Sequence, residues 1–221
     1  MRADDAPNLR DHLIATAARL IGQRGTAGLA VRDIAREAQV SDGALYNYFE
    51  DKEDLLAHAL LAHVGSVMGS AQPMPRPGSG TVAGNLARFI DMGLDTLIRV
   101  TPAFAGLLSQ PKVLTRFRAM VGGDEAFGAD GTDPPGTAPP GEADEPGGLP
   151  DMLAAYLRAE QRLGRIDPGA DVDSAVTLIV GAMHGQILPR VLFGPPGQPV
   201  ATPPGLSARL VGTVLSGIAP H

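Results

Sequence analysis

Apolar residues recur at intervals of three and four along most of this chain, which is the spacing of amphipathic helices. A first helix is expected from Asn8, which can cap it, to Gly25, which can end it. A short helix with Ile34, Ala35 and Ala38 on a narrow apolar face follows. Further helices are predicted at about 52–70, 81–100, 102–109, 111–120, 150–163, 171–193 and 206–218. The pattern therefore predicts an all-α fold.

Proline, glycine and acidic residues interrupt this pattern. Residues 122–148 hold eight glycines, five prolines and seven carboxylates, with no lysine or arginine. Such a composition cannot bury enough apolar surface to fold, so we expect a disordered loop there, as also at residues 1–7. An acidic activation surface is the less favoured alternative. Pro189 is expected to kink the helix at 171–193.

The segment from Val31 to Leu56 predicts a helix, a tight turn, a second helix and the start of a third, which is the layout of a helix-turn-helix. Ser41 and Asp51 stand where they can cap the second and third helices. Leu45 and Phe49, four residues apart, should point inward. Lys52 lies in the first turn of its helix, against the preference of the helix dipole, and fits a phosphate docked there.

These residues resemble the tetracycline-repressor (TetR) family of bacterial one-component regulators. The matching positions are Val31 to Ala35, Ala38, Val40, Ser41, Gly43, Leu45, Tyr46, Tyr48, Phe49, Lys52, Leu55 and Leu56. With the glycine-ended first helix, the resemblance covers about residues 8–64. It implies an N-terminal three-helix helix-turn-helix domain (residues 1–50), a linking helix (51–70), and a C-terminal helical bundle (71–221) for ligand binding and dimerisation.

Two positions depart from the family pattern. Ala30 stands where the family has a capping Ser or Thr, and the loss of such a cap costs about 1 kcal/mol. Gln39 stands where the family has Gly in the turn, and a left-handed backbone at a residue other than glycine costs roughly 1 kcal/mol.

The candidate DNA contacts lie on and around the second helix of the motif. Tyrosine and lysine suit phosphates, and an asparagine carries both a donor and an acceptor for a base edge. The resemblance places Asp42, Gly43, Ala44 and Asn47 at base-reading positions. The full candidate set is Arg32, Ser41, Asp42, Gly43, Ala44, Tyr46, Asn47, Tyr48 and Lys52.

The resemblance also implies an effector pocket inside the C-terminal bundle. Its candidate lining is Phe89, Met92, Phe104, Leu107, Leu108, Phe117, Met120, Tyr156, Met183, His184 and Gln186. Any one of these residues could instead belong to an ordinary core. A lining this apolar suits a hydrophobic effector of little or no charge.

Charge and composition test this interpretation. The chain of 221 residues carries a net charge of −6, and residues 1–64 hold seven Lys and Arg against ten Asp and Glu. A net negative charge is unusual for a DNA-binding domain. With no cysteine, the chain has no disulfide, thiolate metal site or cysteine nucleophile. We find no catalytic, metal or cofactor motif, no apolar run long enough to span a membrane, and no signal peptide, so a cytoplasmic protein that is not an enzyme is expected.

The sequence thus predicts a homodimer that binds operator DNA and is released by a small hydrophobic molecule. Its two C-terminal helices, apolar on more than one face, would pair with their copies, as the resemblance implies. The alternative among DNA-binding proteins is an activator or a regulator that has no ligand. The alternative outside DNA-binding proteins is a helical small-molecule-binding or scaffolding protein with a vestigial helix-turn-helix. The net negative charge of residues 1–64 favours this alternative.

Overall fold

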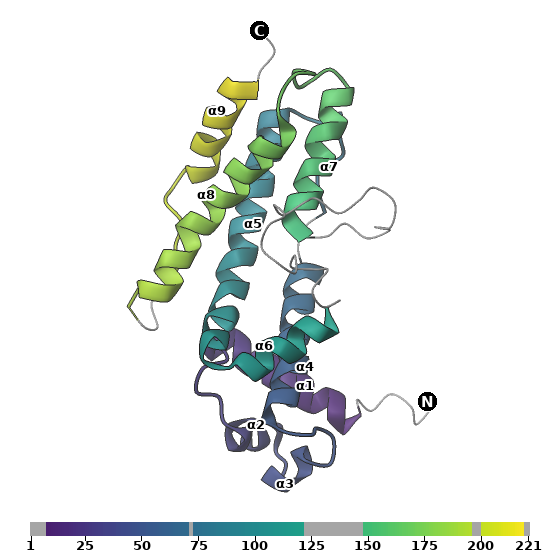
Figure 1. The fold of residues 1–221 in the computed structure, drawn as a ribbon, viewed down its shortest axis with the longest axis vertical. Helices are drawn as coiled ribbons and strands as arrows, with labels where there is room; N and C mark the ends of the chain where they lie inside the picture. Colours follow the sequence, from purple (N-terminus) through teal and green to yellow (C-terminus); the bar gives the residue numbers. More distant parts are fainter. Residues whose placement is uncertain (1–7, 71–72, 122–147, 196–199, 219–221) are drawn as a thin grey trace. The chain divides into compact units, whose positions relative to one another are not determined.

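The computed structural model describes residues 8–70, 73–121, 148–195 and 200–218. The chain divides into two compact units (Figure 1). Unit 1 comprises residues 1–70 and 99–127, and unit 2 comprises residues 71–98 and 128–221. All secondary structure in the described residues is helical, so the predicted all-α fold is confirmed. The expected loop at 122–148 lies outside the described residues except for Gly148, as do residues 1–7.

Unit 1 is built around α4 (Lys52–Gly69), which packs against α1 (Leu9–Arg24) and α6 (Pro111–Met120). The short helices α2 (Val31–Ala38) and α3 (Asp42–Leu45) complete it, with α2 packed on α1 and α3 (Figure 1). The core joins side chains from all of these helices: Leu13, Ile21, Ile34, Leu45, Leu56, Leu60, Val113 and Phe117 are among its buried members. The unit thus combines the predicted helix-turn-helix with a segment from far along the chain.

The expected caps of unit 1 have mixed outcomes. Asn8 and Asp51 accept backbone N–H groups at the starts of α1 and α4, as predicted. Ser41 precedes α3, but its side chain makes no capping hydrogen bond, so that prediction is wrong. Ala30 gives α2 no side-chain cap, and Gln39 ends α2 in the left-handed region with φ 58°, so both departures carry their expected backbone cost.

The predicted separate helix at 102–109 is wrong. Instead α5 (Val82–Ala105) continues through Pro102, and a single 3₁₀ turn, η1 (Gly106–Ser109), follows it. The fixed φ of proline is compatible with a helix, and the buried Ala103 and Leu107 favour continuation. Gly106 is required by a close approach, since a Cβ there would lie 2.6 Å from the backbone nitrogen of Ala27.

Unit 2 contains the first part of α5 together with α7 (Gly148–Arg162), α8 (Val172–Phe193) and α9 (Leu206–Ile218). α8 packs against α7 and α9 (Figure 1). Its core includes Leu86, Phe89, Ile90, Leu153, Leu157, Ile179 and Met183. The bounds of α7, α8 and α9 agree with the predicted ones to within two residues at each end.

The structure corrects which face of α8 is available to a partner. Apolar spacing along this helix assigns six residues to the dimer seam: Val172, Val176, Ile179, Val180, Met183 and Ile187. In the structure Val180 is partly buried, and the other five are buried in the core of unit 2. The exposed apolar residues of this helix are Leu178, Leu188, Leu192 and Phe193. Contrary to the sequence expectation, α8 is also long and apolar enough to cross a membrane by length and composition alone. Its buried residues contribute to the core of unit 2.

A polar cluster fastens the segment before α5 to α7 within unit 2. The carboxylate of Glu160, which is fully buried, accepts the N–H of Gly78 at 3.1 Å and lies 3.2 Å from the guanidinium of Arg165. Arg165 in turn donates to the carbonyl of Gly80. Beside them, Asn85 donates to the hydroxyl of Tyr156 at 2.9 Å. Burial, with the nearby Glu160, raises the pKa of Tyr156 to about 12, so this hydroxyl stays protonated.

We predict that Glu160→Ala destabilises the protein by about 2–3 kcal/mol, because it leaves a partly buried guanidinium and a backbone N–H without their acceptor. Denaturant unfolding followed by circular dichroism measures this cost. The control is Arg158→Ala, which removes an ion pair to Asp173 from a solvent-exposed surface and should cost about 0–1 kcal/mol. Equal costs for the two variants would contradict a structural role for the cluster.

Candidate nucleic-acid interface

The surface that sequence analysis assigns to DNA is a short segment, residues 42–48, which we call the reading turn. α3 supplies its first four residues, and turns closed by bonds from the N–H groups of Asn47 and Tyr48 complete it. Leu45 and Phe49 are 2% and 4% exposed, so both point inward as predicted. Tyr46, Asn47 and Tyr48 are exposed, and Tyr46 reaches 59%. The burial of two residues thus turns three polar side chains outward.

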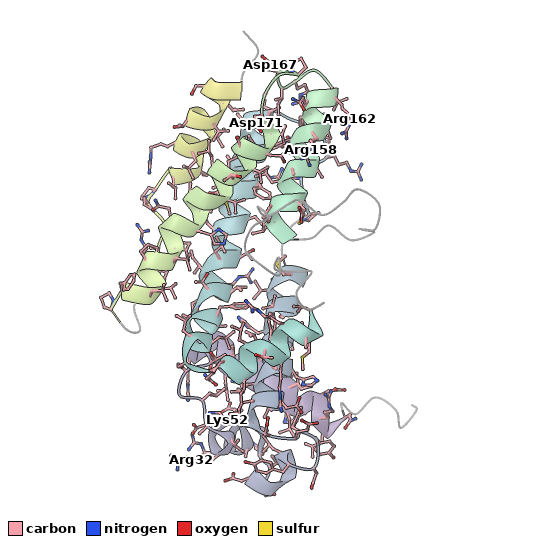
Figure 2. The ribbon with its side chains drawn as sticks, viewed as in Figure 1. Arg32, Lys52, Arg158, Arg162, Asp167 and Asp171 are labelled. Carbon is pink, nitrogen blue, oxygen red and sulfur yellow. The ribbon has the colours of Figure 1, made fainter. Side chains whose placement is uncertain are left out.

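Two cations without ion-pair partners accompany the reading turn. Arg32 lies in the first turn of α2 and is exposed, and Lys52 is the first residue of α4. Within the described part of the chain, no carboxylate pairs with either. Figure 2 shows both at the end of unit 1 that α2, α3 and the start of α4 form. They are therefore available to phosphate oxygens.

Two other arginines of unit 1 have partners. Arg36 pairs with Asp33 of the same helix at 3.0 Å. Arg10 donates to Nε2 of His58 at 2.8 Å and lies over the ring of Phe49, 5.3 Å from its centroid. Arg10 therefore braces the residue that follows the reading turn.

The start of α4 holds a dense group of charges. Asp51 accepts the N–H of Asp54 at 2.8 Å and two hydrogen bonds from Arg116 of α6, at 2.5 and 3.0 Å. Desolvation raises the pKa of Asp51, but its bonds to the Asp54 N–H and to Arg116 outweigh this and hold the pKa below its ordinary value. Asp51 is therefore ionised at neutral pH. Sequence reasoning missed Arg116, although residues 99–121 hold four cations and no carboxylate.

A shallow surface depression that encloses no volume lies beside the reading turn. Its lining consists of Val31, Leu45, Tyr46, Phe49, Asp51, Lys52 and Leu55. Pockets for drug-sized ligands measure about 300–1,000 Å³, so a depression without enclosed volume does not hold an effector. It does bring together Tyr46 and Lys52, two of the predicted phosphate ligands.

The residues predicted to line an effector pocket fall in both units. Phe104, Leu107, Phe117 and Met120 belong to the core of unit 1, where Phe104 and Phe117 meet edge to face. Phe89, Met92, Tyr156 and Met183 belong to the core of unit 2. Leu108 is 81% exposed, and the partly buried His184 and Gln186 bond to neighbours within α8. The effector pocket stays a prediction, and no described group of His, Asp or Glu residues could hold a metal ion.

Comparison with known proteins decides the family of the N-terminal region. Residues 13–59 match the model of the bacterial regulatory proteins of the tetR family. Residues 13–59 belong to the TetR family. The transcriptional regulator AcrR of Shigella flexneri is 38% identical over 53 residues, which are 24% of this chain and 25% of that protein. The chain spans a quarter or less of the first curated relatives that it matches.

Solved TetR-family structures share the fold over nearly the whole chain. A regulator from Pseudomonas syringae pv. tomato has a TM-score of 0.59 at 19% identity and covers 99% of this chain and 100% of its own. FadR of Bacillus subtilis, solved with stearoyl-CoA, has a TM-score of 0.54 at 20% identity and covers 94% and 98%. The TetR-like fold therefore extends through unit 2, where sequence similarity to the family was only general.

We predict that Lys52→Ala weakens binding to every DNA duplex alike, because a phosphate contact carries no sequence information. The slope of log Kd against log salt should fall by about 1. Fluorescence anisotropy across a salt series measures both quantities. Arg88→Ala removes one exposed cation from unit 2 and serves as the charge-matched control. An unchanged slope for Lys52→Ala would rule the contact out.

Proposed function

We propose that this protein is a ligand-responsive transcriptional repressor that binds operator DNA as a homodimer. The observation that carries the proposal is the reading turn. It presents Tyr46, Asn47 and Tyr48 to solvent above two buried anchors, in a domain of the TetR family. The unpaired Arg32 and Lys52 lie at the same end of unit 1 (Figure 2).

Asn47 is the residue that we assign to base choice. It is exposed in the middle of the reading turn, and its amide offers both a donor and an acceptor. Gly43 and Ala44 offer no side-chain hydrogen bonds, so the remaining selectivity rests on Asp42, on contact with thymine methyl groups and on DNA shape. We assign the contacts with the DNA phosphates to Tyr46, Tyr48, Lys52 and Arg32.

The C-terminal segment of unit 1 offsets part of the acidity of the N-terminal region. Residues 8–70 carry six cations and eight carboxylates. Residues 99–121 of the same unit add four cations and no carboxylate. Over its full extent, residues 1–70 and 99–127, unit 1 holds eleven cations and twelve carboxylates, a net charge of −1. The net negative charge that favours a vestigial helix-turn-helix is thus reduced.

The exposed side of α8 supports the proposed dimer. Leu178, Leu188 and Leu192 are exposed, as are Gly181 and Gly185, and these five positions repeat at intervals of three and four. No heavy atom lies within 4 Å of a Cβ built on either glycine. An apolar stripe with this spacing and with open space at its centre suits close packing against a second helix. We assign it to the α8 of a second copy.

The effector that we propose is a small hydrophobic molecule held by unit 2. The buried side of that unit is almost wholly aliphatic and aromatic. FadR, which shares the fold, was solved with the long-chain acyl ligand stearoyl-CoA. Binding would change the dimer's affinity for DNA through a coupling free energy between the two sites.

A band shift with the DNA that flanks the protein's own gene tests the function. We expect a shift that survives an excess of unrelated duplex, and higher reporter expression when the gene is deleted. Lower expression on deletion would favour the activator. A protein that shifts no duplex, yet unfolds at a higher temperature with an apolar ligand, would favour the small-molecule-binding alternative.

We predict that Asn47→Ala relaxes specificity at one base pair in each half-site, at a cost of about 1–3 kcal/mol for the preferred sequence. Selection of bound sequences from a random pool, repeated with parent and variant, measures this change. Ser66→Ala, an exposed substitution on α4, is the control. The same consensus from parent and variant would contradict the assignment.

We predict that Leu188→Glu dissociates the dimer and abolishes operator binding together, because a carboxylate buried in the seam of each subunit costs several kcal/mol. Sedimentation and band shift at equal concentrations measure the two effects. Leu163→Glu, at an exposed leucine outside α8, should change neither. A monomeric parent that binds a palindromic site tightly would overturn the dimer.

A further inference from the structure

The carboxylates at the start of α4 create an electrostatic problem for DNA binding. Glu50, Asp51, Glu53 and Asp54 surround Lys52 in the sequence. Two of them are needed for structure, since Asp51 caps α4 and Asp54 accepts the N–H of Glu50 at 3.2 Å. A phosphate approaching Lys52 therefore approaches a cluster of like charge, which repels it.

Arg116 of α6 contacts this cluster, although it lies 65 positions after Asp51 in the sequence. Its two terminal nitrogens bond to both oxygens of Asp51, and one of them also lies 3.3 Å from the carboxylate of Glu50. A bidentate pair of this kind fixes geometry as well as charge. One guanidinium thus screens two carboxylates on the side of α4 where Lys52 begins the helix.

The packing of α6 holds Arg116 in place. Val113 and Phe117 of this helix are buried in the core of unit 1, and Phe117 meets the ring of Phe104 edge to face at 5.4 Å. The side chain of Arg116, next to Phe117 in sequence, is 30% exposed. All of these residues belong to unit 1.

We propose that Arg116 is a positioning residue for DNA binding, which neutralises Asp51 and Glu50 so that Lys52 can receive a phosphate. The inference rests on the proposed function and adds a residue outside the helix-turn-helix to it. Arg116 acts through the two carboxylates and does not itself contact DNA.

Removal and rescue of this charge test the inference. Arg116→Ala should weaken binding about fivefold at low salt, to the duplex retained by the parent and to an unrelated duplex of equal length. Glu50→Gln with Asp51→Asn, added to Arg116→Ala, should restore the affinity of the parent to within a factor of about two, because Asn still caps α4. Arg116→Lys should retain most of the affinity.

A matched control variant and the results that would contradict the inference complete the test. Lys112→Ala removes the same charge from the same helix, and in the described residues Lys112 bonds to neither carboxylate, so its loss should be smaller. If the triple variant stays as weak as Arg116→Ala, the pair matters only for structure or Arg116 contacts DNA directly, and the inference fails. Equal affinities of parent and Arg116→Ala would also overturn it. A parent that binds no duplex overturns the proposed function and this inference together.

Discussion

The outward display of Tyr46, Asn47 and Tyr48 depends on the burial of Leu45 and Phe49 in the core of unit 1. α3 has four residues, and an isolated helix shorter than about 12–15 residues is marginal in water. The reading turn therefore has no stability of its own. The core that receives its two anchors is closed by α1, α4 and α6, and Arg10 covers Phe49 from the side of α1. The conformation of the reading turn therefore depends on this core.

The same dependence explains why so many charges crowd the start of α4. A helix that begins immediately after the reading turn needs acceptors for its first N–H groups, and Asp51 with Asp54 supply them. Acceptors at this position are carboxylates, which oppose an approaching phosphate. The cation that offsets them comes from α6, the helix that also closes the core. Stability and electrostatics at the reading turn are thus determined by one packing interaction between α4 and α6.

The helix-turn-helix was predictable because its constraints are local. The spacing of Leu45 and Phe49, the capping Asp51 and the left-handed Gln39 all follow from residues within a few positions of one another. The prediction failed where local signals compete with tertiary contacts. Pro102 suggests a helix end, but buried Ala103 and Leu107 carry the helix past it. Ser41 is a good capping residue by type, yet its hydroxyl makes no such bond here.

The sequence by itself determined the all-α class, the family of residues 13–59 and the residues that face outward on the reading turn, since short-range periodicity and a specific motif encode them. Only the tertiary structure decided which side of α8 is free, because a helix that is apolar all round has no pattern to indicate its buried face. It also brought the cationic segment 99–121 into unit 1. Arg116 and Asp51 are 65 residues apart, and only the packing of α6 against α4 brings them into contact.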